Sequence, residues 1–551
     1  MSAAEFVERL TRGDSLAGES LYGVDLSRHT IGAAKLQGST LSSVAAVETG
    51  LRGADLSDAK IVQCDLARAD LEGANLSGAA GLRVRFTGAR LTRANLARAK
   101  FIATDLSGAN LRGADLQGAV FDGADLRGAD LSGANLEGAV FLTANMQGAV
   151  LRDAKLSRTS LIGANLEGAD LAGANLEKSV LLQANLVKAR LPKKLSFCML
   201  DQAVFAAPNA DVASAKGPDF SGCDLTSASL SEMDLRGANF RHAILENANL
   251  KDSDLSGVDF ADADLRRTVF LGARLREANL RDQDLEMTIF SKADLAQADF
   301  SGAKLLMTNL DEADLEEANF SGAFIRAASF RDARLTGIRI AQTTFRGVDF
   351  SEIDLRDLPL TGLSLVACSF KKSNLSGMDL SGCDFTNAEF TEADASGANF
   401  SNATLVRATV REANMQATNW EGVHAKGVFL GGTSLQGSNL RGVKMRGSAL
   451  PGTRVEHTNF TEADLRDCHL VELSAKGAVF TRARFDYADL SRANLEGAEV
   501  SFADFSFANL HRVHDNGVVW SSAKAQLAKV TDMERLEAEG WTAPPRPERY
   551  R

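Results

Sequence analysis

The chain has 551 residues, of which 45% are hydrophobic, and a formal net charge of −11. An acidic chain without a basic stripe is not typical of a protein that binds nucleic acid directly. No stretch approaches the 18 consecutive apolar residues of a membrane-spanning helix, and six cysteines are too few for a disulfide framework at this length. Residues 1–15 contain three acidic side chains and no long apolar run, unlike a secretory signal. We therefore expect a cytoplasmic protein, with secretion by a signal-independent route left open.

Residues 1–15 are expected to form a short N-terminal cap helix. Phe6, Val7 and Leu10 are spaced to share one side of such a helix. That side would face the first turn of the structure that follows.

A repeat of five residues fills the next block, residues 16–191. Between Leu56 and Leu191 a large apolar residue occupies 27 of the 28 positions spaced by five, and only Gly81 breaks the run. We call these positions centres. A small residue, usually Ala, stands two positions before each centre, and Asp or Asn usually lies between the two. A repeat this regular predicts a solenoid.

A second block, residues 220–510, has its centres on multiples of five. Of its 59 centres, 56 are large and apolar. The register therefore slips within residues 192–219, which hold Pro192, Pro208 and Pro218. We interpret this segment as a loop or kink that joins two solenoids.

A period of five matches neither a helix nor a flat strand. It suits a chain that turns a corner at every unit and points the centre and the small residue inward. Four units then make one square coil, and neighbouring coils stack by strand-like hydrogen bonds. The Asp or Asn before each centre is suited to bond the backbone of a tight turn.

This pattern of Ala, Asp or Asn, Leu and two variable residues resembles the pentapeptide repeat family. The resemblance covers most of the chain, from about Leu16 to Leu510. It implies an all-β solenoid, a right-handed quadrilateral β-helix, here in two register blocks with short helical caps. Solenoids of this kind present long surfaces to partners.

Residues 511–551 are expected to form a C-terminal helical cap or tail. Trp520, Leu527 and Val530 have loose helical spacing, and Thr531 is placed to begin a capping box. The helix would fold over a last coil rich in Phe. The alternative is a dimerisation tail, which the family resemblance also implies.

The residues that could support catalysis look structural. Five cysteines occupy the small inward position, which leaves Cys198, in the predicted break, as the candidate reactive thiol. His511 and His514 are close in sequence, but no third metal ligand is evident. We expect no enzyme activity, no cofactor and no metal.

The negative charge is concentrated in residues 201–400, whose net charge is −14, whereas residues 1–200 carry +2. Some pentapeptide repeat proteins resemble DNA in shape and charge and bind DNA gyrase. The alternative function implied by this resemblance is therefore a DNA-mimicking gyrase inhibitor or protector that uses the acidic block 219–397. Its charge density reaches about half that of DNA.

One face of block 16–191 is apolar where the repeat should meet water. The residue after the centre is large and apolar at six of the seven coil-spaced positions from 62 to 182; only Asp122 interrupts. Valines precede three centres on the same face. We call this surface the apolar ridge: Val62, Leu82, Ile102, Val120, Val140, Leu142, Ile162, Val180 and Leu182. A patch of this size usually marks an interface. The alternatives are cover by the break segment (Phe197, Met199, Val204) or the tail helix, and self-association as a homodimer.

The sequence thus predicts a non-enzymatic, rod-shaped scaffold or adaptor that binds a protein partner. A bacterial assembly or secretion process is the expected context, by family analogy alone. Direct nucleic-acid binding and membrane insertion are not expected.

Overall fold

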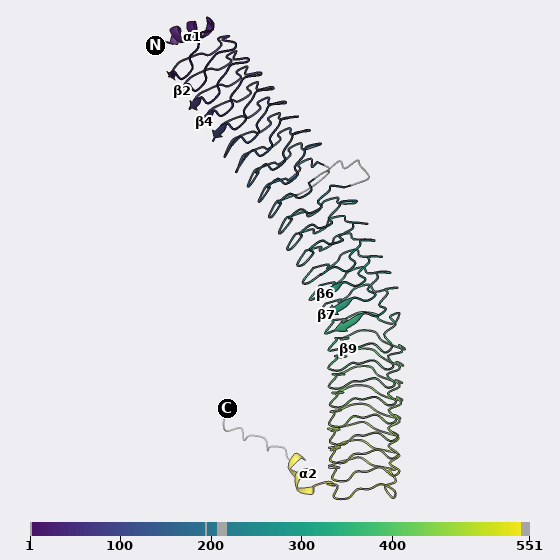
Figure 1. Ribbon diagram of the computed structural model, residues 1–551. Coiled ribbons are helices and arrows are strands. Elements are labelled where there is room, and N and C mark those ends of the chain that lie inside the picture. Colours follow the sequence, from purple (N-terminus) through teal and green to yellow (C-terminus); the bar gives the residue numbers. More distant parts are fainter. Residues whose placement is uncertain (1–2, 193–194, 206–216, 541–551) are drawn as a thin grey trace, which may run out of the picture. The chain divides into compact units, whose positions relative to one another are not determined.

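The computed structural model describes residues 3–192, 195–205 and 217–540. The chain divides into two compact units, residues 1–303 and 304–551, each considered by itself below. Both consist of stacked parallel coils (Figure 1).

Each coil has four sides and is built from four repeats, as the period of five predicts. Each inter-coil pairing joins a residue to its equivalent four repeats later. Four pairings connect the first two coils: Ser15↔Lys35, Ser20↔Thr40, Asp25↔Ala45 and Thr30↔Gly50. The predicted fold class, an all-β solenoid, is confirmed.

The repeat explains the coil residue by residue. The centre and the small residue are buried, as at Phe101 and Ala99, and Phe rings from successive coils stack. The centroids of Phe101 and Phe121 lie 5.7 Å apart. The Asp or Asn side chain closes the turn, as where the Ser57 amide donates to Oδ1 of Asp55 at 3.0 Å.

Unit 1 begins with α1 (Ala3–Thr11), in which Phe6 and Leu10 are buried and Val7 is half-buried. One face of its first coils forms a five-stranded parallel sheet in the order β1 to β5. Its strands are β1 (Ser20–Tyr22), β2 (Thr40–Ser42), β3 (Lys60–Val62), β4 (Ala80–Leu82) and β5 (Lys100–Ile102). This sheet carries the first part of the apolar ridge.

Gly81, which breaks the run of apolar centres, lies at the middle of β4. A Cβ atom at this position would lie 2.1 Å from the ring of Phe101 in the next coil. The Phe101 ring therefore takes the space that a side chain at Gly81 would need. The missing centre is filled by its neighbour, and the core stays continuous beneath Leu82.

The predicted break is only partly a break, which corrects our interpretation of residues 192–219. Residues 195–205 continue the coil: Met199 pairs with both Val180 and Asp224, and Leu195 and Leu200 are buried. The register slips because the coil between Val180 and Met199 is one position shorter than the others. The next coil, between Met199 and Asp224, is longer and includes 206–216, which lie outside the described residues.

Unit 2 contains a four-stranded parallel sheet in the order β6 to β9. Its strands are β6 (Lys304–Leu306), β7 (Phe324–Arg326), β8 (Thr344–Arg346) and β9 (Leu365–Val366). Stacked coils then continue to the pairing of Asn509 with Lys529.

The predicted C-terminal helical cap, residues 511–551, is wrong in two respects. Trp520 and Leu527 belong to a further coil, and within residues 511–540, the part of this segment that the structure describes, only α2 (Met533–Gly540) is helical. Asp532 caps α2, because its carboxylate accepts the Arg535 amide at 3.1 Å, whereas the Thr531 hydroxyl accepts the amide of Arg512. No residue of α2 is buried, so it does not seal the coil beside it. Neither helix in the described ranges is long and apolar enough to cross a membrane.

Candidate protein-interaction surface

The apolar ridge is assembled by the pairing of successive coils in unit 1. The sheet registers align Val62 with Leu82 and Leu82 with Ile102. Leu82 is 45% exposed and Ile102 47%, whereas Val62 is half-buried. The predicted residues therefore form one column of side chains on an open sheet face.

The side chains in the second half of the ridge, residues 120–182, are less exposed than Leu82 and Ile102. Backbone hydrogen bonds continue the column through Asp122, Leu142, Ile162 and Leu182. The residue before the centre becomes Val at 120, 140 and 180, and these valines form a second column beside the first. All six apolar side chains in this half are half-buried. The most accessible members of the predicted ridge thus lie at Leu82 and Ile102.

Residues 195–205, a described part of the break segment, do not cover the ridge, contrary to one of our alternatives. Phe197, Met199 and Val204 lie within the coil, and Met199 extends the valine column past Val180. Met199 is 47% exposed. The described part of the break therefore lengthens the apolar surface.

Asp122 interrupts the ridge at an energetic cost. One of its carboxylate oxygens is buried and has no hydrogen-bond partner among the described residues. A buried polar atom without a partner is destabilising. We expect Asp122→Leu to raise the free energy of unfolding by about 1 kcal/mol, measured by chemical denaturation. Glu137→Leu, at the equivalent position on a neighbouring face, is the control and should change stability by less than about 0.5 kcal/mol. A loss of stability in Asp122→Leu would contradict this account.

Cys198 is not the reactive thiol that its place in the predicted break suggested. All six cysteines are buried. The Cys198 thiol donates to the Leu176 carbonyl of the preceding coil at 2.9 Å. Burial raises the pKa of Cys368 and of Cys468 to about 12. These thiols fill the small inward position.

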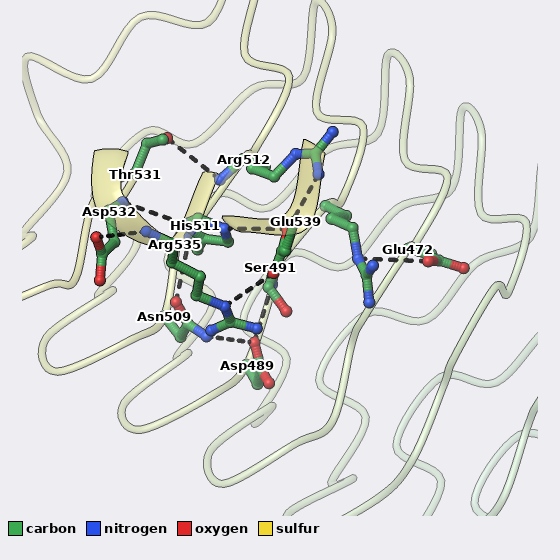
Figure 2. A network of polar contacts seen from close by, with 11 residues as sticks. Glu472, Asp489, Ser491, Asn509, His511, Arg512, Thr531, Asp532, Arg535 and Glu539 are labelled. Atoms are coloured by element: carbon green, nitrogen blue, oxygen red, sulfur yellow. Dashed lines mark hydrogen bonds and ion pairs between the residues drawn. The ribbon is translucent and has the colours of Figure 1, made fainter. Parts of the chain in front are cut away.

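His511 and His514 do not form a metal site, and the described residues hold no group of three or more metal-ligating side chains. His511 instead joins α2 to its coil (Figure 2). It is 3% exposed, and its Nδ1 accepts the Asp532 amide at 3.1 Å. Arg512 and Arg535 both donate to the Glu539 carboxylate, at 3.0 and 2.9 Å. The cluster attaches a helix to a coil.

The acidic block 219–397 lies partly in each unit, and many of its carboxylates are paired with arginine. Arg236 contacts Asp234 at 2.7 Å, and Arg356 contacts Asp354 at 2.6 Å. The arginine hydrogen bond is the first cause that lowers the pKa of each of these two carboxyl groups. Arginine side chains held by these ion pairs therefore interrupt the negative charge of the acidic block.

Comparison with known proteins identifies the repeat. A family model described as pentapeptide repeats matches residues 51–80, 83–193, 219–291, 293–332 and 438–512, and a pentapeptide repeat region model matches 363–440. Proteins with these repeats are generally structural or interaction proteins. No curated protein matches the chain.

Three solved structures illustrate the range of similarity. QnrB1, a plasmid-mediated fluoroquinolone resistance protein, is 21% identical over 36% of this chain and 100% of its own, with a TM-score of 0.26. HetL from Nostoc sp. strain PCC 7120, involved in heterocyst differentiation regulation, is 30% identical over 48% of this chain and 89% of its own, with a TM-score of 0.16. The PL6 family alginate lyase AlyGC is 9% identical over 96% of this chain and 99% of its own, with a TM-score of 0.23. With these TM-scores, none of the three indicates a function for this chain.

Proposed function

Because this chain belongs to the pentapeptide repeat family, we propose that it is a non-enzymatic scaffold or adaptor that binds a protein partner through the apolar ridge. The observation that carries the proposal is the column at Val62, Leu82 and Ile102, which lies on an open sheet face. Solenoid coils present such columns at a fixed spacing of about 4.8 Å, which gives a partner a rigid template.

The energy available on this surface fits a specific interaction. Burial of an apolar side chain contributes about 1.5–3 kcal/mol when it becomes fully covered. Leu82 and Ile102 have nearly half of their surface left to bury. Because the coils are already ordered, the scaffold loses little conformational entropy on binding.

DNA mimicry is less well supported. Its surface would need unbroken negative charge, and the arginines paired with carboxylates in block 219–397 interrupt it. The net charge of −14 in residues 201–400 also falls short of the charge density of DNA.

The test compares three baits in affinity capture: the wild type, Leu82→Asp/Ile102→Asp, and Met287→Asp/Ile289→Asp. Met287 and Ile289 are 43% and 36% exposed in the same unit, so the third bait carries the same chemical change away from the ridge. All three should unfold at the same temperature. We expect a protein retained by the wild type and the control and reduced at least about 10-fold on the ridge variant, since a buried charge weakens an apolar interface by more than about 1.4 kcal/mol.

Identical capture by all three baits would refute the ridge as a binding surface. If the shared protein were a gyrase subunit released by moderate salt, DNA mimicry would replace the scaffold proposal, because charge-driven contacts are screened by salt.

A further inference from the structure

The exposed part of the ridge lies in a basic stretch of an acidic chain. Residues 73–104 contain no Asp or Glu and six Lys or Arg, although the chain as a whole has 72 acidic residues against 61 basic ones. Leu82 and Ile102, the most exposed ridge residues, both fall within it.

The coils place cations on both sides of the apolar column. Lys60 and Lys100 are the first residues of β3 and β5, one position before the buried centre, whereas Val62 and Ile102 are one position after it. Arg83 directly follows Leu82 at the corner of the coil, where its φ is 51°. All three basic side chains are exposed.

These three cations are unpaired within the part of the chain that the structure describes. Lys60, Arg83 and Lys100 have no carboxylate within 4.0 Å, whereas the neighbouring Arg85 lies 3.0 Å from Asp65. Many other arginines in this protein pair with a carboxylate one coil away, as Arg112 does with Asp130. The ridge is therefore bordered by positive charges that no described group of this protein neutralises.

We propose that the partner of the ridge is an acidic, amphipathic polypeptide segment, whose apolar side chains cover Leu82 and Ile102 and whose carboxylates pair with Lys60, Arg83 and Lys100. This inference rests on the proposed function and names the chemistry of its partner. Complementary charge at the rim raises the association rate and fixes the register of the bound segment, while the apolar centre supplies most of the affinity.

The surface favours a polypeptide over nucleic acid or lipid. Single-stranded nucleic acid is bound by a series of aromatic side chains on which bases stack. The column between the cations consists of Val62, Leu82 and Ile102, and the aromatic side chain of Tyr22 lies two coils before Val62, beyond Lys60. A bilayer surface binds side chains that reach into the acyl region. Val62, Leu82 and Ile102 do not project that far, because each has more than half of its surface buried in the sheet face. A segment that alternates carboxylates with apolar side chains satisfies both the column and its rim.

The experiment has two parts. In the first, Ile102→p-benzoylphenylalanine in the full-length chain is activated by light in the producing cells, and the cross-linked segment is sequenced by mass spectrometry. We expect a protein segment with several carboxylates among apolar residues. A cross-link to lipid, to nucleic acid, to a second copy of this chain, or to a segment without carboxylates would overturn the inference.

In the second part, the identified protein is titrated against Lys60→Glu/Arg83→Glu/Lys100→Glu at low and high salt. We expect binding to weaken about 10- to 100-fold and to lose most of its salt dependence. The matched control, Arg407→Glu/Lys426→Glu/Lys444→Glu, reverses three exposed cations of unit 2 that also have no ion pair among the described residues, and it should change affinity less than about 2-fold. If the first triple variant fails to fold, Lys60→Gln/Lys100→Gln should still weaken binding.

The two proposals fail in different ways. If Leu82→Asp/Ile102→Asp abolishes binding and the charge reversal leaves it unchanged, the ridge remains the interface and the acidic partner is refuted. If no cross-link forms at Ile102, and neither variant changes binding of the protein that the wild-type bait captures, the ridge is not an interface and both proposals are refuted.

Discussion

Phe370→Ala should reduce the stability of unit 2 by about 3–5 kcal/mol. The Phe370 ring is fully buried and stacks on Phe350 below and Phe390 above, with centroids 5.7 and 4.9 Å away. Phe385 contacts it edge-on at 5.6 Å. Truncation removes these contacts and leaves a cavity that the rigid coils cannot close.

Chemical denaturation with hydrogen exchange measures both the size and the place of this effect. Coils contact only their neighbours, so protection should fall most in the coils next to Phe370. Phe324→Ala is the control: Phe324 lies in the same unit but is 46% exposed, so its loss should cost less than about 1 kcal/mol. Equal losses in the two variants would show that the stacked rings are not the source of stability.

Release of α2 at acidic pH is the second large expected effect. The pKa of Glu539 is lowered from 4.5 to about 2, first by the hydrogen bond from Arg512 and then by that from Arg535. Because the pKa is lower in the folded state, the carboxylate stabilises the attached helix above pH 4.5, and this contribution is lost as the pH falls from 4.5 towards 2. No buried side chain of α2 compensates for the loss.

A fluorophore on Glu537→Cys reports the attachment of α2, since all six native cysteines are buried. Its anisotropy should fall across this pH range, and Glu539→Gln should show the low value already at neutral pH. Far-UV circular dichroism checks that the coils stay folded. Unchanged anisotropy in Glu539→Gln would mean that the carboxylate does not hold the helix.

Substitutions at His511 test the contribution of a hydrogen bond to the attachment of α2, separately from the charge of Glu539. Its Nδ1 accepts the Asp532 amide, so His511→Leu removes the acceptor and should loosen α2. His511→Asn retains an acceptor oxygen near the same place and should restore much of the attachment. If both substitutions behave alike, the histidine acts only by filling space.

The period of five could predict most of the fold, because every inward position follows from it. The same arithmetic missed the continuation at Leu195 and Leu200, because it assumes a constant unit and one unit here is shorter by a single position. At the C-terminus, Ala523 and Ala528 stand two positions before multiples of five, as the repeat requires. The looser helical spacing of Trp520 and Val530 concealed that signal.

The ridge could be predicted as a column but not as a graded surface. Spacing by whole coils located Leu82 and Leu142 alike and placed the valines at 120, 140 and 180 on the same face. Only the structure shows that Leu82 is exposed whereas Leu142 and these valines are half-buried. The basic border was present in the sequence as the acid-free stretch 73–104. The sequence does not show that these cations lie on both sides of the column. That arrangement depends on the turn of the backbone at Arg83, which places Arg83 on the side opposite Lys60 and Lys100.

The coil geometry also has a mechanical consequence. In unit 1 the backbone hydrogen bonds that hold a coil run to the adjacent coil, as from the Leu106 amide to the Asp125 carbonyl at 2.7 Å. A pull on the end of the chain along the stacking direction therefore opens the layer that holds the terminal coil before the layers behind it. Each coil that peels away frees four repeats of chain, an extension of roughly 60 Å. A single coil can thus yield under tension and absorb work while the coils behind it keep their shape.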